Sequence, residues 1–143
     1  MHNKLKISSK IIEDNETAVA RAISDENYVQ GYLLIHSLIE SLLRVFLGLE
    51  DEKKRFYDLI QAYRSYLVTI NYPAMTFVDE LEKFNKRRNR IVHDLWKKGY
   101  SATNKQAESA TTAAVMMYGL FIEWLETFDE HFSERGFELS NDI

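Results

Sequence analysis

Three residues in the second half of the chain have side chains that could act together on a phosphate. Arg88, Asn89 and His93 lie within six consecutive positions, in the run Arg-Asn-Arg-Ile-Val-His. Arginine carries a permanent charge and a fork of N–H donors that matches phosphate oxygens. Histidine titrates near neutral pH and can serve as a general base or a general acid. We expect these three residues to be catalytic, with Asn89 orienting His93 or hydrogen-bonding the phosphate.

Arg88 interrupts the apolar pattern of the helix expected around it. It stands at the centre of a stripe of apolar residues that recur at spacings of four and three: Phe77, Leu81, Phe84, Ile91 and Leu95. This spacing predicts a helix packed along its length. A charge within such a stripe needs a partner or an anion, and a break in a consistent pattern is typical of a functional site. The alternative is a structural ion pair with Glu40, which we expect to support the site in either case.

The spacing of Arg88 and His93 has a geometric consequence. Five residues apart, they lie about 140° from each other around a regular helix. A single helix therefore cannot easily direct both side chains at the same atom. Either the two residues flank a cleft, or two copies of the helix face each other across a dimer axis. We predict a homodimer whose interface includes this helix.

These residue types suit the cleavage of RNA, which carries its own nucleophile, the 2′-hydroxyl. Cleavage needs a base for that hydroxyl, an acid for the 5′-oxygen, and positive charge beside the developing phosphorane. Two copies each of Arg88 and His93 would supply all three functions. The expected products are a 2′,3′-cyclic phosphate and a 5′-hydroxyl. No metal or other cofactor enters this scheme.

The same region is a basic island in an acidic chain. The whole chain has a net charge of −4, whereas residues 81–100 carry seven basic and two acidic side chains. A local basic island predicts an anion site rather than a general polyanion-binding protein, although a solvated helix face would have the same composition. The residues expected to contact RNA phosphates are Lys86, Arg87, Arg90, Lys97 and Lys98.

Other functional classes find little support in the sequence. The chain has no Cys, no Glu-x-x-His and no glycine-rich phosphate loop, and its four His are scattered. We therefore expect no metal-binding residues. Residues 31–49 are mostly apolar but include His36, Glu40 and Arg44, which favours a buried helix over a membrane span. The first ten residues contain no apolar segment typical of a secretion signal. We therefore expect a cytoplasmic protein.

Periodicity and helix-ending residues predict an all-α fold. The chain contains only five Gly and one Pro, too few for a protein of many short strands. We expect a single domain over residues 1–143, with a core at about 14–135 and short flexible termini. Its architecture is expected to be an antiparallel bundle of four main helices plus a short N-terminal one. The expected helices cover about 14–23, 26–46, 56–70, 73–98 and 103–132. We expect Ser24 or Asp25 to cap the start of the second helix, and Ser101 or Thr103 to cap the start of the fifth. Gly48 should end the second helix and Gly99 the fourth.

The segment from Arg88 to His93 resembles the R-x4–6-H motif of HEPN domains, in which a polar residue typically follows the arginine, as Asn89 does here. The run from His36 to Arg44 is similar to the long early helix of that family, where an acidic residue often recurs, here Glu40. The resemblance extends over about residues 28–132. It implies a toxin or defence protein that dimerises, cleaves RNA without a metal and is often paired with an antitoxin protein.

The chain departs from one branch of the family. That branch has a tyrosine two residues after the histidine, as the target of a nucleotidyltransferase antitoxin, whereas this chain has Leu95. The resemblance therefore does not extend to that type of partner. Because many HEPN domains are not catalytic, an alternative function is a helical bundle that binds RNA, a nucleotide or a partner protein.

Overall fold

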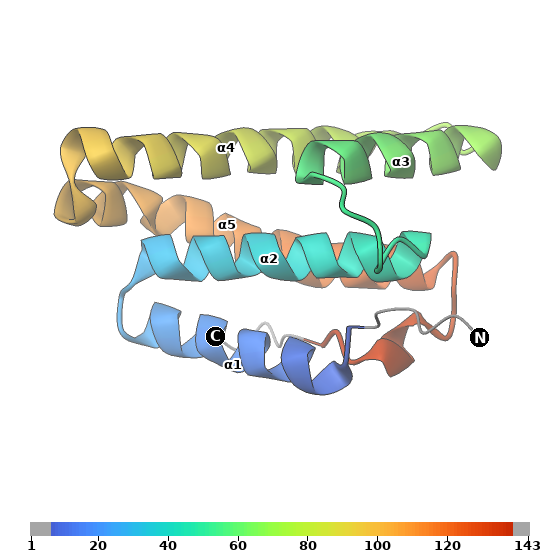
Figure 1. Ribbon diagram of the computed structural model, residues 1–143, viewed down its shortest axis with the longest axis horizontal. Helices are drawn as coiled ribbons and strands as arrows, with labels where there is room; N and C mark the ends of the chain where they lie inside the picture. The colour runs from blue at the N-terminus through green and yellow to red at the C-terminus, as the bar shows by residue number, and fades with distance from the viewer. Residues whose placement is uncertain (1–6, 139–143) are drawn as a thin grey trace.

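The computed structural model describes residues 7–138, the side chain of Ser133 excepted, and these residues contain no strand. The all-α prediction is therefore confirmed for this part of the chain. The terminal residues 1–6 and 139–143, which belong to the termini predicted to be flexible, lie outside it. The long helices lie beside one another along the longest axis of the molecule (Figure 1). In chain order the elements are α1 (Ser9–Ser24), α2 (Tyr28–Leu47), α3 (Phe56–Thr69), α4 (Thr76–Lys98), α5 (Tyr100–Glu126) and the 3-10 turn η1 (Phe132–Arg135).

Helix α1 is longer than the sequence indicated. It begins at Ser9 rather than near residue 14, because the side chain of Ser8 caps it by accepting a hydrogen bond from the N–H of Ile11 at 3.3 Å. With 16 residues it exceeds α3, which has 14. The prediction that the N-terminal helix is the short one is therefore wrong.

The start of α2 also differs from the prediction of a cap at Ser24 or Asp25. The helix follows Asn27, whose side chain makes no capping hydrogen bond. Instead, Oδ1 of Asn104 in α5 accepts a hydrogen bond from the N–H of Val29 at 3.1 Å. A tertiary contact thus satisfies a backbone donor that a local cap would otherwise satisfy.

The two predicted glycine stops are confirmed. Gly48 ends α2 in the left-handed conformation, with φ 70°, and Gly99 ends α4 with φ 87°. Helix α5 begins directly after Gly99, so the predicted caps at Ser101 and Thr103 are wrong; the buried hydroxyl of Thr103 donates to the Gly99 carbonyl at 2.7 Å. At its other end α5 stops at Glu126, before the predicted end at about residue 132.

Helix α2 is the central element and packs against α1, α3, α4 and α5. Its apolar stripe supplies fully buried side chains: Tyr32, Ile35, Leu38, Ile39 and Leu42. A large apolar side chain contributes about 1.5–3 kcal/mol when fully buried, so this face is a major source of stability. The hydroxyl of Tyr32 donates to the Phe84 carbonyl of α4 at 2.7 Å, which fixes how α4 lies along α2.

Helices α2 and α3 run in the same direction, contrary to the fully antiparallel arrangement predicted from the sequence (Figure 1). The ring of His36, in the middle of α2, lies 4.3 Å from that of Phe56 at the start of α3. The ring of Phe46, near the end of α2, lies 5.3 Å from that of Tyr66 near the end of α3. The segment between them therefore returns along α2 and brings the first residues of α3 close to the middle of α2 and α4.

Candidate functional site

Helix α4 lines a cleft on the side where it meets α2 and the start of α3. This cleft, which we call the Arg88 cleft, has a volume of about 360 Å³. Three separate elements supply its side chains, so the packing of α2, α3 and α4 creates it. It is lined by His36, Glu40, Arg55, Phe56, Tyr57, Asn85, Arg88 and Asn89.

Arg88 is half-buried at the edge of this cleft, as its position in the apolar stripe predicted. Its Nη1 donates a hydrogen bond to Oδ1 of Asn89 at 3.2 Å. Within the described chain it forms no ion pair with a carboxylate. Glu40 instead lies 3.8 Å from Nη2 of Arg44, one turn further along α2. The structure thus does not show the Arg88–Glu40 ion pair that was the alternative interpretation, although both residues line the same cleft.

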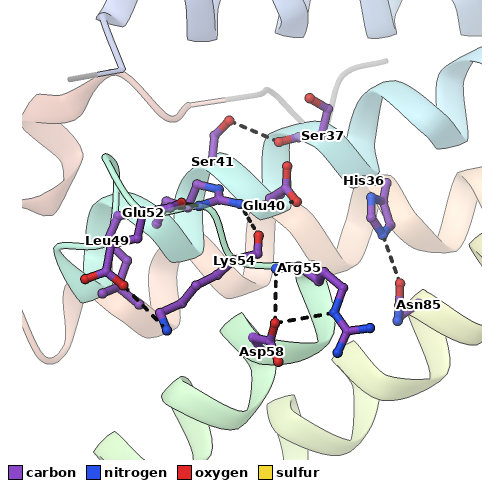
Figure 2. Close-up of polar contacts among 11 residues, drawn as sticks. His36, Ser37, Glu40, Ser41, Leu49, Glu52, Lys54, Arg55, Asp58 and Asn85 are labelled. Atoms are coloured by element: carbon purple, nitrogen blue, oxygen red, sulfur yellow. Dashed lines mark hydrogen bonds and ion pairs between the residues drawn. The ribbon is translucent and has the colours of Figure 1, made fainter. Parts of the chain in front are cut away.

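His36 is a member of the cleft that the sequence analysis did not assign to the site. Its ring packs against Phe56 at 4.3 Å and against Phe84 at 5.3 Å between centroids. Its Nε2 lies 3.2 Å from Oδ1 of Asn85, and Figure 2 shows the side chain directed from α2 towards α4. A polar residue inside the apolar α2 was the available signal, but only the packing of α2 against α4 shows that it lines the same cleft as Arg88.

The environment of His36 favours its neutral form. Burial lowers the pKa of the imidazole below its ordinary value; the hydrogen bond with Asn85 partly opposes this shift, and the nearby positive charge of Arg88 reinforces it. A neutral imidazole keeps one nitrogen as an acceptor while the other donates. At neutral pH the positive charges of the cleft therefore come from Arg55 and Arg88, not from His36.

The rim of the cleft is held in place by hydrogen bonds to the backbone. The guanidinium of Arg44 donates to the carbonyls of Glu52 and Lys54, which ties the loop before α3 to α2. The N–H of Arg55 donates to Oδ2 of Asp58 at 3.2 Å, and its Nε donates to the same oxygen at 3.5 Å. These contacts order the first turn of α3, which carries Tyr57 into the cleft wall.

His93 lines a different cleft, between α4 and α5. This hollow, which we call the α4–α5 groove, has a volume of about 500 Å³ at the His93 end, and a hollow of about 260 Å³ that shares Arg90, Asp94 and Gln106 continues it. Nδ1 of His93 lies 3.8 Å from a carboxylate oxygen of Asp94, and its ring meets that of Trp96 edge-on at 4.7 Å. Four of the predicted phosphate-binding residues line the groove: Arg87, Arg90, Lys97 and Lys98.

The structure therefore divides the predicted site residues into two groups. Arg88, Asn89 and Glu40 belong to the Arg88 cleft, whereas His93 belongs to the α4–α5 groove with most of the basic residues. Lys86 is exposed on α4. In the described part of the chain, Arg88 and His93 thus line two different clefts, in agreement with their separation around the helix.

The surface of α4 between Arg88 and His93 carries two exposed apolar side chains, one turn apart. Going around the helix from Arg88 to His93, one passes Val92, Asn85, Trp96 and Asn89. Val92 is 39% exposed and Trp96 is 74% exposed. Exposed apolar side chains of this size beside polar ones are typical of interaction surfaces. We call Val92 and Trp96 the apolar strip.

No protein-family model, curated protein or solved structure matches this chain. None of the helices in the described range is long and apolar enough to span a membrane. Within residues 7–138, no three His, Asp or Glu side chains are grouped so that they could hold a metal ion. Any functional assignment consequently rests on the geometry of α4 and its two clefts.

Proposed function

We propose that the protein is a metal-independent endoribonuclease of toxin or defence type, built on a HEPN-like helical bundle and acting as a homodimer in the cytoplasm. The observation that supports this most directly is the apolar strip of α4, which lies between Arg88 on one side and His93 on the other. A second copy that covers the strip would bring Arg88 and His93 of both chains to one interface. The site would then be complete only in the dimer.

The energetics of the apolar strip favour such an interface. A tryptophan buries roughly 150–250 Å² when it is fully covered, and Trp96 is 74% exposed in the single chain. Covering it and Val92 removes apolar surface from water, which favours association. The cost of bringing the basic residues of two chains together is reduced when an RNA phosphate lies between them.

The proposed reaction uses only groups of the protein and of the RNA. A neutral His93 accepts the proton of the 2′-hydroxyl, and the 2′-oxygen attacks the adjacent phosphorus. Arg88 stabilises the negative charge of the phosphorane through its guanidinium. The bond from phosphorus to the 5′-oxygen then breaks, and the protonated His93 of the second chain donates a proton to that oxygen. The products are a 2′,3′-cyclic phosphate and a 5′-hydroxyl end, and DNA is inert because it lacks the nucleophile.

The α4–α5 groove is the proposed path of the RNA backbone beyond the reacting phosphate. Lys97 and Lys98 lie one turn beyond His93 on α4, and Arg90 lies one turn before it. Phosphate contacts of this kind position a nucleic acid without reading its sequence. The remainder of the chain has a negative net charge, which disfavours RNA elsewhere on the surface. An endoribonuclease of this type would require an antitoxin protein as a further partner.

Cleavage of RNA in the presence of EDTA tests the proposal. The wild-type protein, incubated with mixed tRNA and single-stranded RNA, should produce 2′,3′-cyclic phosphate ends with and without the chelator. His93→Ala should abolish cleavage and leave the fold intact, because the side chain is exposed. His131→Ala is the matched control: this exposed histidine pairs with Glu134, at 3.3 Å, near η1 and far along the chain from α4, so its loss should leave cleavage unchanged. Equal cleavage by wild type and His93→Ala would contradict the proposal.

The second candidate function is a non-catalytic module that binds RNA, a nucleotide or a partner protein. The observation that favours it is the separation of Arg88 and His93 into two clefts within one chain. A protein that sediments as a monomer at micromolar concentration and cleaves no RNA, yet binds it, would support this function over the first.

A further inference from the structure

The Arg88 cleft contains a feature that phosphate chemistry alone does not explain. Tyr57, in the first turn of α3, lines the cleft although 56% of its surface is exposed. No aromatic ring in the described part of the chain contacts the ring of Tyr57, in contrast to the neighbouring Phe56, which packs against His36. The exposed side chain of Tyr57 therefore lines the same cleft as the half-buried Arg88.

We infer that the Arg88 cleft binds one unpaired nucleotide of single-stranded RNA, with its base stacked on Tyr57 and its phosphate held by Arg88. This inference rests on the proposed function, since it assigns a subsite for the RNA that the protein cleaves. The chemistry of the walls fits a nucleotide: an aromatic face for the base, the carboxamides of Asn85 and Asn89 for its polar edge, and guanidinium groups for the phosphate.

The size of the cleft agrees with a single nucleotide. Its volume of about 360 Å³ lies at the small end of the range of roughly 300–1,000 Å³ typical of small-molecule sites. A base reaches such a cleft only after leaving its stack, which is easiest in a single-stranded region. The subsite therefore selects loops and unpaired segments over duplex RNA.

The charges in the cleft are compatible with a phosphate. Arg88 has no carboxylate partner in the described chain, whereas the charge of Arg55 is partly offset by Asp58, at 3.5 Å from its Nε; Glu40 is the acidic side chain in the cleft wall. Glu40 lies 3.8 Å from Arg44, which offsets its repulsion of an anion. Asn85 accepts from His36 through Oδ1, so the N–H donors of its carboxamide remain for a ligand. The neutral imidazole behind it gives this carboxamide a defined orientation.

The inference is tested with a short single-stranded RNA that carries 2′-O-methyl groups at every position, which prevents cleavage, and one 2-aminopurine base. Binding is followed by anisotropy, and stacking by quenching of the 2-aminopurine fluorescence. Tyr57→Ala should weaken binding by about 5- to 150-fold, the range expected for loss of one base–aromatic stack, and should abolish the quenching. Tyr57→Phe keeps the ring and should behave as wild type.

Tyr100→Ala provides the matched control, because this tyrosine is also exposed but lies at the junction of α4 and α5. It should retain the affinity and the quenching of wild type. If Tyr57→Ala binds as tightly as wild type while wild type cleaves RNA, the nucleotide subsite is refuted and the proposed function stands. If wild type neither binds nor cleaves RNA, the proposed function itself fails. Adenosine monophosphate binding as tightly as the RNA would overturn the assignment to RNA in favour of a free nucleotide.

Discussion

Replacing Arg88 by leucine distinguishes a catalytic role for this residue from a structural one. In the single chain, the guanidinium makes one hydrogen bond, to the adjacent Asn89 at 3.2 Å, and no ion pair with any carboxylate in the described range. Leucine would extend the apolar stripe between Phe84 and Ile91, both of which are buried. The substitution therefore removes little that stabilises the fold and adds an apolar contact.

The expected change in stability follows from these contacts. Loss of a partly exposed hydrogen bond and gain of a half-buried apolar side chain should together change the free energy of unfolding by less than about 1 kcal/mol. For a chain of this length that corresponds to a shift in Tm of no more than roughly 4 °C. If Arg88 formed a buried ion pair, its loss would cost about 3–5 kcal/mol, a fall in Tm of roughly 10 °C or more.

The expected change in activity is much larger. If Arg88 stabilises the phosphorane, Arg88→Leu should lower kcat by about 100- to 1,000-fold, the effect typical of removing one donor to a developing oxyanion. Arg87→Leu is the control, because Arg87 is the preceding residue but lines the α4–α5 groove; it should raise KM for RNA and leave kcat nearly unchanged. Thermal unfolding and steady-state cleavage of both variants provide the measurements. A large fall in Tm for Arg88→Leu, or equal kcat in the two variants, would refute the reasoning.

Two further predictions concern salt and pH. If the four basic residues of the α4–α5 groove each contact a phosphate of single-stranded RNA, the logarithm of the RNA association constant should fall with log salt with a slope of about −2.8. This is a loss of affinity of about 50-fold between 50 and 200 mM salt, and Lys97→Ala should reduce the magnitude of the slope by about 0.7. Titrations that show no salt dependence would contradict this. Burial lowers the pKa of His36 below its ordinary value of about 6.5. The unfolded chain therefore takes up a proton at this residue at a higher pH than the folded chain does. The free energy of unfolding should consequently fall as the pH drops from about 6.5 through the folded-state pKa. His36→Phe, which keeps a ring between Phe56 and Phe84, should lose less stability than wild type between pH 7.5 and 5.5 in urea unfolding, whereas equal losses would show that His36 is not the group responsible.

Local features of the sequence determined the helices and several of their ends. The stripe of α2 predicted a helix with one buried face, and Tyr32, Ile35, Ile39 and Leu42 are indeed fully buried. Gly48 and Gly99 were recognisable as stops, since glycine adopts the positive φ that these ends require at little cost. The angular separation of Arg88 and His93 was also predictable, because it depends only on the geometry of a single helix.

Contacts between helices decided what the sequence could not. Asn104 of α5 replaces the local cap expected for α2, and nothing near Ser24 in the sequence indicates that partner. The parallel course of α2 and α3 brings His36 and Tyr57 into the cleft of Arg88. Along the chain His36 is 52 positions and Tyr57 is 31 positions from Arg88, and 21 positions separate His36 from Tyr57, so no periodicity relates them. Periodicity reports which face of a helix is buried, whereas the packing of three helices determines which side chains meet at its edge.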